Sequence, residues 1–145
     1  MKKQFGGLTV IVLAFFLFFN GSVNAQSEVH VYTLTTWKMT VPEDGSNKEL
    51  NQLFKEWSDK ITKKNDKILS EKVLRHQSGS DSRDWLIITE YANWDDINAA
   101  DKIQVKLIDK AWPNKDDRRK YFKTFRKYSV FHSDEIMNEI PSLTK

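Results

Sequence analysis

The 145-residue chain contains no cysteine, so it has neither a disulfide framework nor a lipid-modified N-terminal cysteine. Beyond residue 25, glycine occurs only at Gly45 and Gly79, which is too few for a glycine-rich dinucleotide loop. The chain also lacks a Gly-x-Ser-x-Gly nucleophile motif. These absences argue against serine-elbow hydrolases and dinucleotide-dependent enzymes, and they leave the hydrophobic core to hold the fold by itself.

The first 25 residues have the pattern of a secretory signal peptide. Two lysines precede an apolar run from Leu8 to Phe19, and Val23-Asn24-Ala25 offers small residues at the spacing that signal peptidase requires. An uncleaved membrane anchor is the alternative, but the run is too short and wrongly flanked for a spanning helix. We expect cleavage near Ala25, a secreted or periplasmic protein, and no stable membrane insertion after cleavage.

The mature chain, residues 26–145, is nearly neutral. The full chain has 23 Lys and Arg against 20 Asp and Glu, and removal of the two signal lysines leaves 21 against 20. A nucleic-acid partner would require a basic patch, so we expect none. The remaining length is sufficient for a single domain with its own core.

Hydrophobic periodicity predicts the element order β-α-β-β-α-(α)-β. Strands are expected at residues 28–39, 68–76, 85–91 and 130–137, which are rich in β-branched and aromatic residues. Helices are expected from a Ser46-x-x-Glu49 capping box to a left-handed cap at Asn65, from Asn93 or Asp95 to residue 111, and over 116–128. The strand at 85–91 is the most apolar and is predicted to be central.

This order predicts an α+β, ferredoxin-like fold: an antiparallel sheet with helices on one face and an extra helix before the last strand. Both faces of the strand at 28–39 are partly apolar, so we expect both sheet faces to be covered. A second copy of the same sheet is the simplest second cover. Two sheets face to face across a two-fold axis would form a dimeric α/β barrel, which predicts a homodimer.

Several stretches carry a family resemblance over residues 28–140. They are Thr35-Thr36-Trp37, Val73-Leu74-Arg75-His76, Asp81-Ser82-Arg83-Asp84, Glu90-Tyr91 with Trp94, and His132-Ser133-Asp134-Glu135-Ile136. In these stretches the chain resembles the dimeric α/β-barrel superfamily, which includes antibiotic-biosynthesis-type monooxygenases, and is similar to a small secreted branch of it. The resemblance implies oxidation of quinol-like substrates without a cofactor, haem degradation, or ligand binding alone. The haem-degrading branch requires a helical histidine, which neither long predicted helix contains, so we expect no cofactor.

Three residues are candidate catalytic groups. His132 and Asp134 are two apart on a predicted strand, so they share a sheet face, where the carboxylate could orient the imidazole for proton transfer. The alternative is a polar edge strand whose charge blocks aggregation. His76 lies at the mouth of a predicted hairpin beside Arg75, where the two either bind an anionic ligand or are solvated.

The remaining candidates are binding residues. Glu90, on the most apolar strand, is either a barrel-interior acid or the partner of a cation such as Arg75 or Lys72. Aromatic candidates for a pocket, or alternatively for the core, are Trp37, Trp85, Trp94 and Tyr32. The three histidines, His30, His76 and His132, lack any recognised metal-ligand spacing, so we expect no metal.

Two functions follow as expectations. The first is a secreted α/β-barrel enzyme that acts on a small, partly apolar molecule, by a cofactor-independent monooxygenase-like or isomerase-like reaction. The alternative is a non-catalytic ligand-binding or structural interaction module, which the absence of any sharp catalytic motif favours. Convergence of His132, Asp134, His76 and Glu90 in one site would favour the enzyme.

Overall fold

Four strands form one antiparallel sheet in the computed structural model, which describes residues 29–145. The strands are β1 (Val31–Met39), β2 (Ser70–Arg75), β3 (Asp84–Tyr91) and β4 (Ser129–Asn138), in the spatial order β2-β3-β1-β4. The predicted central position of β3 is confirmed, and β1 lies beside it in the middle of the sheet. The predicted signal peptide lies outside the described residues.

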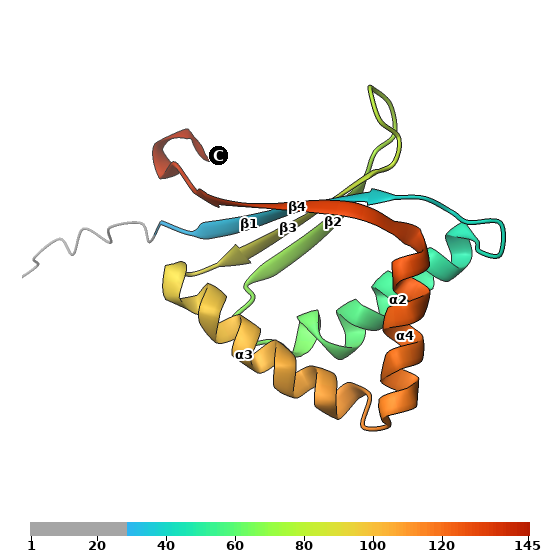
Figure 1. The fold of residues 1–145 in the computed structure, drawn as a ribbon. Helices are drawn as coiled ribbons and strands as arrows, with labels where there is room; N and C mark the ends of the chain where they lie inside the picture. Colours follow the sequence, from blue (N-terminus) through green and yellow to red (C-terminus); the bar gives the residue numbers. More distant parts are fainter. Residues whose placement is uncertain (1–28) are drawn as a thin grey trace, which may run out of the picture.

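Three α-helices lie on one side of this sheet (Figure 1). They are α2 (Asn47–Lys60), α3 (Trp94–Ala111) and α4 (Lys115–Tyr128), with short 3-10 turns η1 (Thr62–Lys64) and η2 (Pro141–Leu143). The predicted ferredoxin-like α+β arrangement, including the extra helix before the last strand, is therefore confirmed.

The start of α2 differs in one respect from the predicted capping box. The Ser46 hydroxyl accepts a hydrogen bond from the Glu49 amide at 3.0 Å, as expected. The Glu49 carboxylate does not return to the Ser46 amide; instead, it accepts a hydrogen bond from the Tyr128 hydroxyl. That hydroxyl also accepts a hydrogen bond from the Ser46 amide at 2.9 Å. A residue at the far end of the chain thus completes the cap, which no local motif predicts.

Asn65 has a different role from the predicted left-handed cap. Its φ of −92° is ordinary extended backbone, so the prediction of a left-handed conformation is wrong. Asn65 is almost fully buried, and its side-chain amide donates a 3.0 Å hydrogen bond to the carbonyl oxygen of Ala100 in α3. The asparagine therefore ties the end of α2 to α3, while Asn93 caps α3 as expected by accepting from the Asp96 amide.

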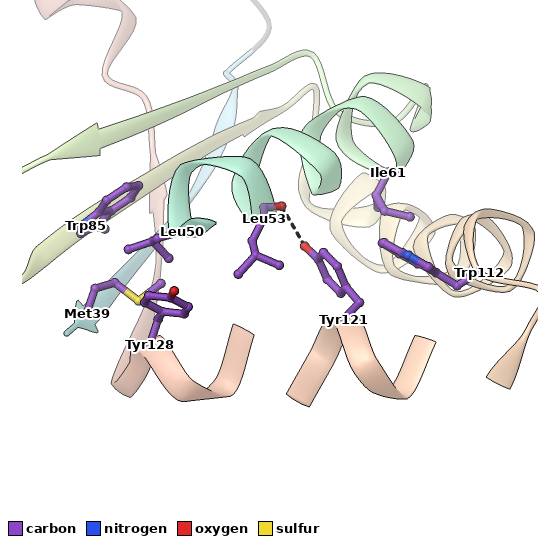
Figure 2. Packing of buried hydrophobic residues seen from close by; sticks show 8 residues of the cluster. All are labelled: Met39, Leu50, Leu53, Ile61, Trp85, Trp112, Tyr121 and Tyr128. Carbon is purple, nitrogen blue, oxygen red and sulfur yellow. Dashed lines mark hydrogen bonds between the residues drawn. The ribbon is translucent and has the colours of Figure 1, made fainter. Parts of the chain in front are cut away.

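The hydrophobic core lies towards one end of the sheet, between α2, α4 and the ends of β1 and β3. Figure 2 shows its buried members, of which Leu50, Ile61 and Tyr128 are fully enclosed. The Tyr121 hydroxyl reaches across from α4 and donates a 2.9 Å hydrogen bond to the carbonyl of Leu53. Because the core fills only this end, it leaves space between the rest of the sheet and α3.

The sheet face that points away from the helices is not covered within the described chain. It carries apolar side chains that alternate with the inward-facing ones: Leu34, Leu74, Leu86, Ile88, Phe131 and Met137. Leu74, Phe131 and Met137 are 48%, 62% and 46% exposed. Both faces of the sheet were expected to be covered. Within the described chain, the helices cover one face and leave the other uncovered.

Candidate functional site

A cavity of about 650 Å³ lies between the helix-facing side of the sheet and the three helices. This volume is within the range of small-molecule sites in proteins. Its floor is made by strand residues: Thr33, Thr35, Trp37, Glu71, Val73, Ile87, Thr89, Tyr91, His132, Asp134 and Ile136. Its walls and roof include helix residues: Phe54, Trp57, Ile97, Asp101, Gln104, Tyr121, Phe122, Phe125 and Arg126.

Strand register determines which side chains form this floor. Thr35 of β1 is opposite Ile87 of β3 and Asp134 of β4, and Trp37 is opposite His132. Opposed residues of neighbouring strands project to the same face, and residues two apart along one strand do so as well. On each strand, every second residue therefore faces the helices, and the residues between them face away.

One wall of the cavity is aromatic. The ring of Phe125 meets Trp37 edge to face with centroids 5.3 Å apart and meets Phe54 at 5.6 Å. Phe54 also stacks on the buried Trp85 at 4.8 Å. The half-buried rings of Trp37, Phe54 and Phe125 pack against the core on one side and line the cavity on the other, so the core fixes their position. The result is a rigid apolar surface suited to a flat molecule.

The predicted pair His132 and Asp134 lies on the β4 side of this cavity. Nε2 of His132 is 3.3 Å from Oδ2 of Asp134, and the imidazole stacks on Trp37 with ring centroids 4.3 Å apart. The other carboxylate oxygen, Oδ1, accepts a 2.7 Å hydrogen bond from the Thr35 hydroxyl. Two partners therefore orient the imidazole, and its Nδ1 is left to exchange a proton with a ligand. The pair faces the helices and not the interior of a sheet-to-sheet barrel.

A second polar group, Glu71 of β2, lies on the opposite side of the floor. Its carboxylate accepts hydrogen bonds from the hydroxyls of Thr62 at 3.0 Å and Thr89 at 3.4 Å. Burial raises the pKa of the Glu71 carboxyl above its ordinary value, against the effect of these two hydrogen bonds. Burial also raises the pKa of the neighbouring Tyr91 hydroxyl. This end of the cavity therefore disfavours negative charge.

Glu90 and Tyr32 lie on the outer face of the sheet, away from the cavity. Glu90 accepts hydrogen bonds from Ser70, from Nδ1 of His30 at 2.6 Å and from the Tyr32 hydroxyl at 3.1 Å. The Ser70 hydrogen bond, helped by those from His30 and Tyr32, holds the pKa of the Glu90 carboxyl below its ordinary value. The partner of Glu90 is therefore His30, and not Arg75 or Lys72, which the sequence offered as one of two alternatives.

His76, Arg75 and Trp85 lie near the hairpin that joins β2 to β3. Nε2 of His76 contacts the backbone carbonyl of Ser78 within the turn. The Arg75 guanidinium lies 5.9 Å from the centre of the Trp85 ring, and Trp85 is a core residue that is 7% exposed. Trp94 is 56% exposed at the start of α3. Of the residues that the sequence proposed, the structure brings Trp37, His132 and Asp134 together in the cavity. Trp85 lies opposite Trp37 on β3 but is buried in the core, and the remaining candidates do not line the cavity.

Sequence reasoning missed Glu71 and the helical rings of the aromatic wall. Glu71 is two residues before Val73, so strand alternation would have placed both on one face. Phe54, Trp57, Phe122 and Phe125 fall on the apolar stripes of α2 and α4, a pattern that by itself predicts core residues. Stripe periodicity predicts which side of a helix faces inward, but a cavity and a filled core produce the same stripe.

Between residues 29 and 145, no three His, Cys, Asp or Glu side chains are grouped closely enough to hold a metal ion. None of the helices described combines the length and the apolar character needed to span a bilayer.

Comparison with known proteins finds similarity in structure alone. No protein-family model and no curated protein sequence matches the chain. Among solved structures, a dimeric ferredoxin-like protein from an uncultured marine organism matches with a TM-score of 0.53 at 11% identity, over 78% of this chain and 90% of that one. The cofactor-independent oxygenase SnoaB from Streptomyces nogalater matches with a TM-score of 0.51 at 10% identity, over 80% and 98%.

The chain has the ferredoxin-like fold. A protein from Caulobacter crescentus, provisionally described as an antibiotic biosynthesis monooxygenase, shares this fold with a TM-score of 0.50 at 11% identity, over 78% and 92%. The structural neighbours thus include both the dimeric ferredoxin-like proteins and the antibiotic-biosynthesis-monooxygenase-like proteins that the sequence resembles. At this identity the fold is the property held in common, and the site must be argued from this chain's own residues.

Proposed function

We propose that this protein binds a small, partly apolar molecule in the cavity between sheet and helices and acts on it as a cofactor-independent oxygenase-like or isomerase-like enzyme. The observation that carries the proposal is that His132 and Asp134 line the same cavity as the aromatic wall. A flat ligand held against Trp37 would lie beside the imidazole that stacks on that ring. The oxygenase SnoaB, which shares the fold, supports this reaction class.

The proposed role of His132 is proton transfer. Asp134 fixes the imidazole through Nε2, and Thr35 fixes Asp134, so Nδ1 can accept a proton from an acidic C–H or O–H of the ligand. In an isomerase-like reaction, His132 returns the proton to a different atom of the ligand. In the oxygenase-like reaction, the substrate supplies the electrons: a CH₂ group and O₂ give C=O and H₂O, which balances without a cofactor.

Substitution of one histidine at a time tests this role. Quinol-like compounds are screened for oxygen uptake, and a substrate found in this way is used with His132→Gln and His76→Gln. Loss of a general base costs about 10²–10⁴-fold in kcat, so this loss is expected for His132→Gln and not for His76→Gln, whose side chain lies in the hairpin turn. Intact turnover in His132→Gln would refute the catalytic assignment.

A non-catalytic binding module is the second candidate. The side chains of His132 and Asp134 are 48% and 58% exposed, so water reaches the pair in this chain by itself. Among the polar candidates from the sequence, His76 and Glu90 do not converge with them. A ligand that occupies the cavity with no oxygen uptake and no isomerised product would favour this candidate.

We propose that the protein is a homodimer whose two sheets meet through their outer faces. The support is the apolar outer face, with Leu34, Leu86 and Ile88 in its middle, and the dimeric description of a protein with the same fold. In that assembly the cavity stays on the helix side of each sheet. Light scattering of the purified protein should give twice the protomer mass, and a protomer mass at micromolar concentration would refute the dimer.

We also propose that the protein is secreted or periplasmic. The apolar run from Leu8 to Phe19 and the Val23-Asn24-Ala25 stretch support this proposal. Mass spectrometry of the protein made in a secreting bacterial host should find a mature chain that begins at Gln26. A chain that keeps its first 25 residues would contradict it.

A further inference from the structure

Glu71 is a carboxylate held inside the cavity by the sheet. It lies on β2 opposite Thr89 of β3, and Thr89 is opposite Thr33 of β1, so the three side chains form one polar row across the floor. Thr89 is 6% exposed, and Glu71 is half-buried. The row is fixed by backbone pairing and therefore presents the carboxylate at a defined place.

The hydrogen bonds of Glu71 leave its charge without a cation. Thr62 donates to Oε1 and Thr89 donates to Oε2, so each oxygen keeps one acceptor position. Over residues 29–145, no lysine, arginine or histidine forms an ion pair with Glu71. A carboxylate that is partly withdrawn from water is stabilised by a counter-charge, and Glu71 has none among the described residues.

The groups around Glu71 do not supply that cation. Thr62 of η1, Thr89 and Tyr91 of β3 and Asp101 of α3 line the same region, and the acidic groups among them disfavour further negative charge. Burial raises the pKa of the Glu71 carboxyl, as expected for an acid without a counter-charge. Among the side chains that face the cavity, the three carboxylates of Glu71, Asp101 and Asp134 outnumber the one guanidinium, that of Arg126, and the imidazole of His132.

The aromatic wall favours the same kind of ligand. Faces of Trp, Tyr and Phe rings attract cations and accept flat apolar groups. Trp57 on α2 and Phe122 on α4 meet edge to face with centroids 6.2 Å apart, and both line the cavity. Bare apolar walls with a carboxylate at one end match a molecule with a flat body and a cationic end.

We propose that Glu71 is the recognition group of this cavity and that the ligand is an arylalkylamine, whose ammonium group pairs with Glu71 while its ring lies against the aromatic wall. This inference rests on the proposed function, because it requires an occupied cavity. An anionic ligand would add negative charge beside Glu71, and a neutral one would leave the carboxylate unpaired. The ammonium group donates to the free acceptor positions of both carboxylate oxygens.

Three indoles of nearly equal size test the charge preference: tryptamine is a cation, tryptophol is neutral, and indole-3-acetate is an anion. Binding to the purified protein is measured by isothermal titration calorimetry near neutral pH. Tryptamine should bind at least about tenfold more tightly than tryptophol, and indole-3-acetate should bind most weakly. Equal or tighter binding of tryptophol or indole-3-acetate would overturn the inference.

Two variants that each remove one negative charge show which residue causes the preference for the cationic indole. In Glu71→Gln, tryptamine should lose its advantage while tryptophol binds as it does to the unchanged protein. The control Glu43→Gln, at an exposed loop position, should keep the full preference. A preference that survives in Glu71→Gln would show that another acid recognises the amine, which refutes the role of Glu71.

Failure of this inference can be separated from failure of the proposed function. If all three indoles bind with equal affinity and shift the indole N–H signals of Trp37 and Trp57, the cavity is a ligand site without amine recognition. If none of the indoles binds, the inference is wrong. A broader fragment screen read on the same two signals then decides whether the cavity binds any ligand, and no hit there would refute the proposed function as well.

Discussion

Tyr128→Phe is the sharpest test of how the walls of the cavity are held together. Tyr128 is fully buried at the junction of α4 and β4, and its hydroxyl reaches the start of α2. It accepts from the Ser46 amide at 2.9 Å and donates to the Glu49 carboxylate. Phenylalanine keeps the ring and removes these two hydrogen bonds together.

The expected loss follows from what the two partners can do without the hydroxyl. Ser46 is exposed and Glu49 is partly exposed, so water can reach both groups and replace part of the loss. The free energy of unfolding should fall by about 1–2 kcal/mol, below the cost of leaving a charged group buried and unpaired. For a domain of this length, this corresponds to a drop in Tm of about 3–10 °C.

Tyr121→Phe is the matched control. Its hydroxyl donates to the carbonyl of Leu53, which lies inside α2 and still accepts the helical hydrogen bond from residue 57. The expected loss is therefore smaller, about 0.5–1 kcal/mol. Both variants are compared by circular dichroism melting at the same protomer concentration, because a dimer's Tm depends on concentration. A Tyr128→Phe protein as stable as Tyr121→Phe would refute the reasoning about the shared cap.

Three further predictions concern charge, helix attachment and assembly. Because burial raises the pKa of Glu71, this carboxylate destabilises the fold above its ordinary pKa and not below it; Glu71→Gln should raise Tm at about pH 8 and leave it unchanged at about pH 3. A higher Tm at both pH values would contradict this cause. Asn65→Ala removes the hydrogen bond to Ala100 and should cost about 1–3 kcal/mol, with faster amide exchange in α3, and unchanged exchange there would refute it. Leu86→Lys should produce folded monomers in light scattering, whereas Val105→Lys, at a position 60% exposed on α3, should remain dimeric; monomers from both would contradict the outer-face interface.

Local patterns in the sequence were sufficient for the elements and their order. The Ser46 and Asn93 caps, the stripes of the helices and the β-branched runs each predict an element without reference to the rest of the chain. Ferredoxin-like topology followed because a strand–helix–strand–strand–helix–strand order has few compact solutions. The cap shared with Tyr128 was missed, because it depends on a residue 79 positions away from Glu49.

The site was only partly predictable because strand alternation assigns residues to two faces without saying which face meets the helices. All five of these residues were predicted as site candidates: His132, Asp134 and Trp37 lie on the helix side of the sheet, while Glu90 and Tyr32 lie on the outer side. Both faces carry apolar residues, so composition gave no preference. Glu71 was overlooked because a carboxylate on a short strand beside Lys72 has the pattern of a solvated edge.

The five tryptophans provide the most direct measurement of the central claim, which is that the cavity between sheet and helices is the ligand site. Trp37 and Trp57 line it, Trp85 and Trp112 are buried in the core, and Trp94 is exposed at the start of α3. A fragment screen on ¹⁵N-labelled protein should shift the indole N–H signals of Trp37 and Trp57 and leave that of Trp94 in place. Fragments that bind and shift Trp94 or the outer sheet face, with Trp37 and Trp57 unmoved, would contradict it.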